Sequence, residues 1–150
     1  MQYWLMKSEP DTYSIDDLQS FGVDHWDGSR NYQVRNFFRD KMQVGDKAFF
    51  YHSNCKEPGI VGTMEIASEA YPDHTAFDSS EKYFDRKSDP ENPRWLMVDV
   101  RYLRHLERMI TLGELRQQKQ IADMKLLQRG NRLSVLPLSK KEWQYILDME

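Results

Sequence analysis

The stretch Tyr3-Trp4-Leu5-Met6-Lys7-Ser8-Glu9-Pro10 carries the first clear structural pattern in the chain. Its first four residues are aromatic or apolar and show no helical spacing, which is typical of a buried strand. Pro10 cannot donate a hydrogen bond to a neighbouring strand, so the strand must end before it. We therefore expect a core strand over residues 3–6 that leads into a turn.

Outward from this strand, several segments combine a capping residue with apolar residues at helical spacing. A serine or threonine followed three residues later by an acid begins residues 14–17, 111–114 and 139–142, and this pattern marks helix N-termini. The expected helices span residues 14–22, 31–42, 111–130 and 139–147, with Gly130 as the C-cap of the third.

Runs of aromatic and β-branched residues predict the other strands. Besides residues 3–6, the expected strands span residues 47–52, 59–70, 95–106 and 132–138. Residues 72–93 are rich in Asp, Ser and Pro, so we expect a long loop that is partly ordered by Tyr71, Phe77, Tyr83 and Phe84. Since helices and strands are mixed without a repeat or linker, we predict an α+β fold with a curved or barrel-like mixed sheet and flanking helices.

Composition narrows the class of protein. With 150 residues, 39% hydrophobic and 30% charged, the chain has enough apolar material for one domain with a core. Its net charge of −3 argues against binding a long duplex chiefly by neutralising phosphates, because that mode needs a concentrated basic face. Basic residues cluster locally, within residues 30–41 and 101–108, which suits a small footprint.

Cysteine usage and hydropathy bear on location. The single cysteine, Cys55, cannot form an internal disulfide, and the apolar run within residues 1–7 is too short for a signal peptide. No stretch approaches the ~20 apolar residues of a membrane span. We therefore expect a cytoplasmic protein without membrane contact.

The patterns of common enzymes and metal sites are missing. The metal-ligand candidates His25, His52, Cys55, His74 and His105 do not form the two closely spaced pairs of a structural zinc site. A Cys55 thiolate activated by His52 is conceivable, but no third group that would orient the pair is visible. We expect neither a metal, nor a cofactor, nor catalysis.

The segment Trp26-Asp27-Gly28-Ser29-Arg30-Asn31-Tyr32 can hold a nucleic-acid base and its phosphate. It places a large aromatic side chain beside a turn that leads, through Arg30, to a helix N-terminus. An aromatic face stacks on a base for roughly 1–3 kcal/mol, and a helix N-terminus with an arginine receives an anion. The alternative for Trp26 is a place in the core, where tryptophan is commonly found.

Other polar residues are candidates for reading the edge of such a base. Ser53 and Asn54 offer a hydroxyl and an amide at a strand end, although both residue types also favour turns. Glu9 and Asp27 can accept hydrogen bonds from an exocyclic amine, as carboxylates do for N4 of cytosine. Each of these two acids could equally be a solvated loop residue.

Together these motifs closely resemble the EVE-domain family. The resemblance covers residues 3–10, Trp26–Gly28, Arg30–Tyr32 and Phe50–Cys55, and it continues through Pro58–Gly62, Glu69–Asp73, Pro93–Trp95, Val98–Val100 and Arg132–Val135. Because the motifs span the chain, residues 1–150 are identified as a single EVE domain. The resemblance implies a PUA-like fold related to the YTH and SRA domains.

The resemblance also implies a pocket for a flipped or single-stranded modified base of DNA or RNA, with modified cytosine as the leading candidate. By analogy with the YTH reader, the pocket would be lined by Lys7, Ser8, Glu9, Trp26, Asp27, Ser53 and Asn54. We expect Arg30 and Arg35 to hold the adjacent phosphate. The second aromatic wall stays open among Tyr32, Phe84 and Trp95.

The resulting expectation is a non-catalytic reader of nucleic acid. One alternative is an enzyme that acts on a modified nucleoside or small metabolite in the same cavity, using Cys55 with His52 or a carboxylate. Another is a protein that binds a small anion or metabolite and never meets nucleic acid. The chain lacks a basic N-terminal extension, so we expect a minimal domain like that of bacterial family members.

Overall fold

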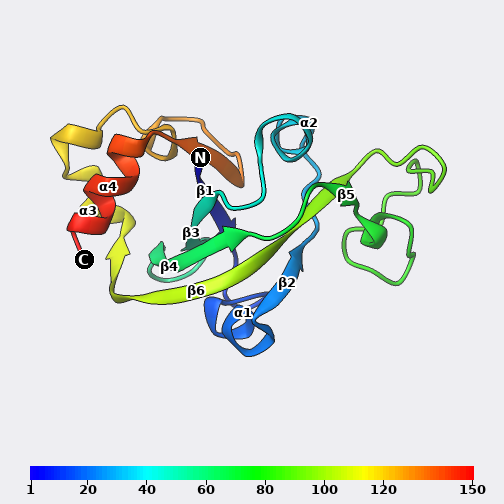
Figure 1. The fold of residues 1–150 in the computed structure, drawn as a ribbon, viewed down its shortest axis with the longest axis horizontal. Coiled ribbons are helices and arrows are strands. Elements are labelled where there is room, and N and C mark those ends of the chain that lie inside the picture. Colours follow the sequence, from blue (N-terminus) through cyan, green and yellow to red (C-terminus); the bar gives the residue numbers. More distant parts are fainter.

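A seven-stranded mixed sheet forms the centre of the computed structural model, which describes residues 1–150 (Figure 1). The strands are β1 (Tyr3–Ser8), β2 (Val23–Trp26), β3 (Lys47–His52), β4 (Gly59–Ile66), β5 (Tyr71–Pro72), β6 (Leu96–Thr111) and β7 (Val135–Leu138). They lie in the order β2-β6-β4-β3-β1-β7, and β5 pairs with β6 outside this path. β1 and β3 are parallel, whereas all other paired strands are antiparallel.

β1 lies between β3 and β7 and is buried on both faces. Its side chains alternate, so Trp4 and Met6 belong to one hydrophobic core and Leu5 belongs to the other. In β3, Phe50 and Phe49 alternate in the same way. A strand that is covered on both faces has no polar face, which explains the unbroken apolar start of the chain.

Four α-helices flank the sheet, and each begins at a side-chain cap. They are α1 (Ile15–Phe21), α2 (Tyr32–Asn36), α3 (Leu112–Arg116) and α4 (Lys140–Asp148). Ser14, Thr111 and Ser139 each form the predicted capping box, and the side chain of Asn31 caps α2. α2 continues into a π-helical turn, Phe37–Lys41, so this helical segment ends near its predicted end. None of the helices combines the length and the apolar character needed to cross a bilayer.

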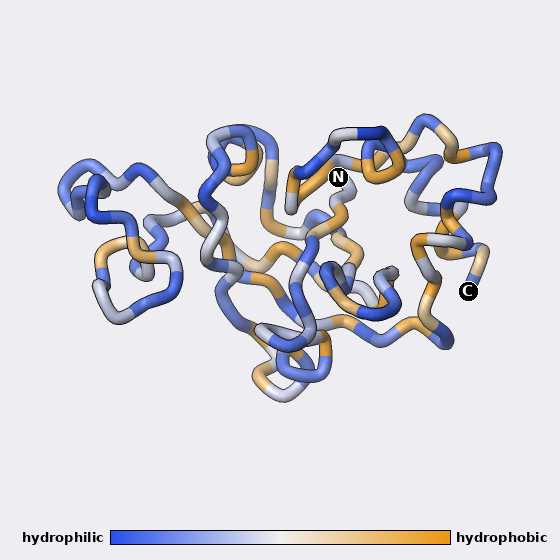
Figure 2. Tube along the Cα trace, turned by 180° about the vertical axis from the view of Figure 1, so that it is seen from behind, coloured by the Kyte–Doolittle hydropathy of each residue, from blue (hydrophilic) through white to orange (hydrophobic).

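The helices divide between the two cores. α1 and α2 contribute Leu18 and Val34 to the core that contains Trp26, while α3 and α4 contribute Leu115 and Ile146 to the other. In Figure 2 apolar residues follow the central strands, and hydrophilic residues dominate the outer loops. The predicted α+β class, with a mixed sheet and flanking helices, is confirmed.

Two strands differ from the sequence-based expectation. β2 was not predicted, because it has only four residues and two of them, Asp24 and His25, are polar. β6 continues to Thr111, beyond the predicted end at Leu106, because much of its second half is exposed and few apolar residues mark it. The predicted ends of two other strands are also corrected: β4 ends at Ile66 instead of Ala70, and β7 begins at Val135 instead of Arg132.

The predicted third helix is wrong beyond its first turns. α3 ends at Arg116, and two 3₁₀ turns follow, at Lys119–Ile121 and Lys125–Leu127. Ile121, Met124 and Leu127 recur every three residues, a spacing that suits 3₁₀ turns as well as an α-helix. Gly130 has a φ of +82° and lies in the loop that follows, so it caps no α-helix.

The predicted long loop joins β5 to β6 and projects from one end of the molecule (Figure 1). It begins with a 3₁₀ turn, His74–Ala76, around which Asp73 and Thr75 are buried. Near its end the indole nitrogen of Trp95 donates to Asp85 at 2.8 Å. Polar contacts therefore order this loop, in addition to the aromatic residues expected to do so.

Candidate functional site

A cavity of about 800 Å³ opens at the edge of the sheet where β1, β2 and β3 end. Because β1 and β3 are parallel, their last residues lie at the same edge, and the N–H of Ser53 donates to the carbonyl of Ser8 at 3.0 Å. The turn after β2 forms a second wall. Residues from the long loop and from the segment before β7, among them Tyr83 and Arg132, complete the cavity.

Most residues predicted to line the pocket line this cavity. They are Lys7, Ser8, Glu9, Trp26, Asp27 and Ser53. Asn54 lies exposed outside the wall with a φ of +50°, and its Nδ2 donates to Oε1 of Glu9 at 2.8 Å. Asn54 therefore positions the carboxylate of Glu9 and does not itself line the cavity.

Trp26 forms the floor of the cavity. Only 7% of its surface is exposed, because the indole packs edge-on against Phe50 with a centroid distance of 5.3 Å. Its indole N–H donates to no protein atom, whereas those of Trp4 and Trp95 donate to carboxylates. No fully buried side-chain nitrogen or oxygen lacks a partner, so the indole N–H of Trp26 keeps some exposure to solvent. Trp26 is thus a core residue that also lines the cavity.

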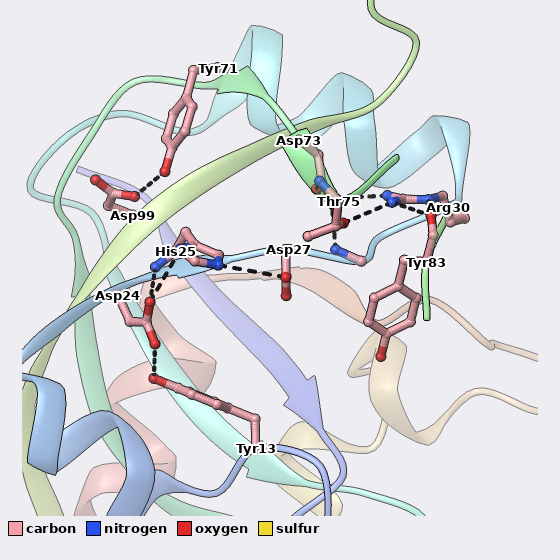
Figure 3. Close-up of polar contacts among 11 residues, drawn as sticks. Tyr13, Asp24, His25, Asp27, Arg30, Tyr71, Asp73, Thr75, Tyr83 and Asp99 are labelled. Atoms are coloured by element: carbon pink, nitrogen blue, oxygen red, sulfur yellow. Dashed lines mark hydrogen bonds and ion pairs between the residues drawn. The ribbon is translucent and has the colours of Figure 1, made fainter. Parts of the chain in front are cut away.

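Asp27, the residue after Trp26, lines the cavity, and its carboxylate faces the imidazole of His25 (Figure 3). The imidazole of His25 lies between two carboxylates, with Nδ1 3.3 Å from Asp24 and Nε2 3.6 Å from Asp27. The hydroxyl of Tyr13 donates to Asp24 at 2.6 Å, whereas no side chain donates a hydrogen bond to Asp27. Burial raises the pKa of Asp27, against the opposing influence of His25. Asp27 therefore offers the cavity a partly desolvated acceptor.

Lys7 is the complementary donor. It lines the cavity from the end of β1, and burial alone lowers the pKa of its ammonium group, with no carboxylate near enough to counteract the shift. A half-buried ammonium without an acid partner is costly, and a hydrogen-bond acceptor on a ligand would offset that cost.

The charges around the cavity are balanced. The acids are Glu9, Asp24, Asp27 and Glu81, and the cations are Lys7, Arg30, Lys82 and Arg132. A small anion would meet as many like charges as opposite ones. A heterocycle with both donors and acceptors fits this arrangement better, which weighs against the anion-binding alternative.

Arg30 does not hold a phosphate, because all of its donors are already used (Figure 3). Nη1 donates to Asp73 at 2.9 Å and to the carbonyl of Ser29, and Nη2 donates to Thr75 at 3.1 Å. Nε and Nη2 both donate to the carbonyl of Tyr83, at 2.9 and 2.6 Å. These five hydrogen bonds occupy all five N–H groups of the guanidinium. Arg30 therefore fastens the long loop to the turn after Trp26, and we call this set of contacts the Arg30 clasp.

Asp73 is the buried partner in the Arg30 clasp. Its side chain is fully buried, and it accepts hydrogen bonds from Thr75, from the backbone N–H of Gly28 at 2.8 Å and from Arg30. Burial on its own would raise the pKa of Asp73, but these hydrogen bonds outweigh it and lower the pKa. Asp73 thus stabilises the fold at neutral pH, and this contribution is lost as the pH falls through its lowered pKa.

The other predicted phosphate and wall residues lie outside the cavity. Arg35 stacks on the ring of Tyr32 at 4.8 Å and donates to Asn36. Tyr32 is 52% exposed and its ring packs against that of Trp95, while Phe84 is 41% exposed. Arg35, predicted as a phosphate ligand, does not line the cavity, and neither does any of the candidates for the second wall, Tyr32, Phe84 and Trp95.

Tyr83 provides the aromatic wall that the sequence reading missed. Its ring lies against the backbone of Gly28, where an added Cβ would sit 2.5 Å from a ring atom, and Gly28 has a φ of +82°. Tyr83 lines the cavity together with Tyr13 and Trp26, its only other aromatic residues apart from His25. The sequence contained one hint: a glycine directly after Trp26-Asp27 permits close approach by another segment.

Of the predicted nucleophile and metal-ligand candidates, only His25 lines the cavity. Neither Cys55 nor His52 lines it, and Nε2 of His52 accepts a hydrogen bond from the backbone N–H of Ile15 at 3.2 Å. His25 and His74 pack against each other edge-on, with centroids 5.2 Å apart. No three His, Cys, Asp or Glu side chains are grouped so that they could hold a metal ion.

Comparison with known proteins assigns the family. The model of the EVE domain matches residues 2–149. The chain belongs to the EVE-domain family. Thymocyte nuclear protein 1 of Homo sapiens is 46% identical to this EVE domain over 167 residues, with 99% of this chain and 73% of that protein covered.

Solved structures of EVE-domain relatives share the whole fold. A Pseudomonas putida protein matches with a TM-score of 0.94 at 47% identity over 98% of each chain. Human THYN1 protein, in complex with 5-methylcytosine containing DNA, matches with a TM-score of 0.91 at 43% identity over 99% of this chain and 97% of that chain. The YTH domain of Zygosaccharomyces rouxii MRB1 protein, at 14% identity and a TM-score of 0.57 over 99% of this chain and 83% of that chain, shares the fold alone. The predicted EVE family and PUA-like fold are confirmed.

Proposed function

We propose that this EVE domain is a non-catalytic reader that holds one modified cytosine of a nucleic acid in the cavity between Trp26, Asp27 and Tyr83. The observation that carries the proposal is that a donor without a protein partner, Lys7, and a partly desolvated acceptor, Asp27, line the same half-buried cavity. The relative in complex with 5-methylcytosine containing DNA supports the choice of base.

The chemistry of cytosine matches these groups. Its N4 amine would donate a hydrogen bond to the carboxylate of Asp27. Its O2 carbonyl would accept a hydrogen bond from the ammonium of Lys7 or from the indole N–H of Trp26. The ring would stack on Tyr83. Stacking is worth roughly 1–3 kcal/mol, and together with two or three hydrogen bonds it offsets the few kcal/mol needed to expose a base, a cost that is lowest in single strands.

The dimensions of the cavity set the size of the ligand. About 800 Å³ lies within the range of roughly 300–1,000 Å³ of small-molecule sites, which accommodates a nucleotide and not a duplex. The base must therefore leave its stack, or come from a single strand of DNA or RNA.

A cytoplasmic location of the protein stays a prediction.

Asp27→Asn tests the proposal. The amide has the same shape but lacks the charge that strengthens the bond to the N4 amine, so the affinity for a single-stranded oligonucleotide with one 5-methylcytosine should fall by roughly tenfold. Fluorescence anisotropy titration measures this change. Asp148→Asn, at an exposed site on α4, is the matched control and should bind like the wild type. Equal affinities of Asp27→Asn and wild type would refute the role of Asp27.

The same variant makes a prediction about stability. Because burial raises the pKa of Asp27, the folded state binds a proton more tightly than the unfolded state, and the charged carboxylate lowers stability at neutral pH. Asp27→Asn should therefore have a higher Tm than the wild type at pH 7, and the difference should vanish near pH 3, where Asp27 is protonated in both states. Thermal unfolding followed by circular dichroism at both pH values checks this. If Asp27→Asn binds more weakly although it is more stable, its loss of affinity cannot be caused by unfolding.

The enzymatic alternative has a direct test. Incubation of the pure protein with 5-methyl-2′-deoxycytidine, followed by chromatography, should return the nucleoside unchanged. Conversion of the nucleoside that is lost in Cys55→Ala would favour the enzyme.

A further inference from the structure

A second hollow, of about 490 Å³, lies beside the cavity. Arg132 lines both hollows. The chain from Ser29 to Gln33 also runs along both hollows. Ser29 and Arg30 line the cavity, and Asn31 and Gln33, at the start of α2, line the second hollow. A chain that leaves the cavity on this side therefore passes directly into the second hollow.

We call this hollow the basic groove; its charged and amide side chains are Asn31, Gln33, Lys125, Gln128, Arg129 and Arg132, with Asn131 between them. It contains three cations and no acid, in a protein whose net charge is −3. The balanced charges of the cavity suit an uncharged heterocycle, whereas the uniform positive charge of the groove suits anionic groups of a ligand.

The cations of the groove are free, unlike other basic clusters of the chain. On β6, Arg101, Arg104 and Arg108 are each paired with a carboxylate, of Glu65, Glu150 and Glu114 respectively. Lys125, Arg129 and Arg132 form no ion pair and no side-chain hydrogen bond, and all three are exposed. The basic cluster predicted on residues 101–108 is therefore neutralised, whereas the three cations of the groove are unpaired.

The loop that carries the groove is held in place by its own contacts. Nδ2 of Asn131 donates to the carbonyl of Lys125 at 2.9 Å, and Oδ1 of Asn131 accepts from the N–H of Leu133 at 3.0 Å. Met124, just before the loop, is fully buried. The cations are thus presented on an ordered backbone, which lowers the entropic cost of binding.

We infer that the basic groove binds the phosphates of the nucleotides next to the base held in the cavity, so that a single strand runs from the cavity across Arg132 to Lys125 and Arg129. The inference rests on the proposed function. Exposed cations hold a free anion weakly, but a base fixed in the cavity places its neighbouring phosphates at a high effective concentration over the groove. Phosphate contacts of this kind carry no sequence information, so the cavity selects the base and the groove adds affinity.

The double variant Lys125→Gln/Arg129→Gln tests the inference, because these two cations line the groove and not the cavity. Its binding to the single-stranded oligonucleotide with one 5-methylcytosine should be roughly tenfold weaker at 50 mM salt. The slope of log K against log salt should decrease by about 1.4, since each phosphate contact on a single strand contributes about 0.7. Titrations at several salt concentrations measure both quantities.

The nucleoside 5-methyl-2′-deoxycytidine, which has no phosphate, separates the groove from the cavity. Wild type and double variant should bind it equally, as followed by the NMR shift of the Trp26 indole N–H. The matched control Lys140→Gln/Lys141→Gln removes the same charge from the exposed first turn of α4 and should keep the wild-type salt slope.

Each other outcome overturns the inference. A wild-type salt slope in Lys125→Gln/Arg129→Gln would refute phosphate binding by the groove and would leave the proposed base-reading function untouched. An equal decrease of the slope in the α4 control would show a general effect of net charge. If the wild type bound neither the oligonucleotide nor the nucleoside, the proposed function and the inference would both fail.

Discussion

Replacing Arg30 by alanine is expected to lower the free energy of unfolding by about 3 kcal/mol or more. The substitution leaves the carboxylate of Asp73 fully buried without its cation, and removal of one partner from a buried ion pair typically costs about 3–5 kcal/mol. For a domain of this size the corresponding decrease in Tm is roughly 10 °C. Urea and thermal unfolding followed by circular dichroism measure both.

Arg39→Ala is the matched control for this prediction. Arg39 pairs with Asp40 at 2.8 Å, but both side chains are about half exposed, and such surface pairs contribute only about 0–1 kcal/mol. The two variants lose the same side chain and the same charge. A loss below about 1 kcal/mol in Arg30→Ala would show that the Arg30 clasp does not stabilise the fold.

Tyr83→Ala is expected to weaken binding of the 5-methylcytosine oligonucleotide by about 5- to 150-fold. This range corresponds to the roughly 1–3 kcal/mol that a stacked base contributes. The main-chain carbonyl of Tyr83 accepts the hydrogen bonds of Arg30, so the substitution leaves the hydrogen bonds of the Arg30 clasp in place and removes only the ring that the guanidinium faces at 5.8 Å. Anisotropy titration should therefore detect a loss of affinity with a small change in Tm.

Two further variants identify the cause of that loss. Tyr83→Phe keeps the ring and should retain most of the affinity, whereas a loss equal to that of Tyr83→Ala would point to the hydroxyl. Phe84→Ala removes a neighbouring aromatic ring that does not line the cavity and should bind like the wild type. Wild-type affinity in Tyr83→Ala would refute Tyr83 as the stacking wall.

The sequence predicted those features that depend on near neighbours. The capping boxes at Ser14, Thr111 and Ser139 involve residues three positions apart, and all three form. Lys7 reaches the cavity because it lies near the end of the predicted strand β1, and Trp26 reaches it beside the turn that Asp27-Gly28 marks in the sequence. The predicted third helix failed because apolar residues at every third position suit two kinds of helix.

The role of Arg30 depends on residues far away in the sequence. Its partners Asp73 and Tyr83 are 43 and 53 positions distant, and nothing in the local motif shows that five hydrogen bonds will occupy its guanidinium. An arginine beside a helix N-terminus was therefore read as a ligand for phosphate. The second aromatic wall was missed for the same reason, since Tyr83 reaches the cavity only because the long loop is fastened there.

The placement of β1 has a consequence for how the polypeptide acquires its shape during synthesis. β1 is made before the other strands, but one of its two neighbours, β7, is the last strand to be made, so Leu5 pairs with Leu136 across most of the domain. Such non-local pairing slows folding, and until it is complete an apolar strand has an unpaired edge that favours self-association. A nascent chain that is stalled or truncated before Val135 should therefore aggregate, whereas a chain that includes β7 can pair the free edge of β1.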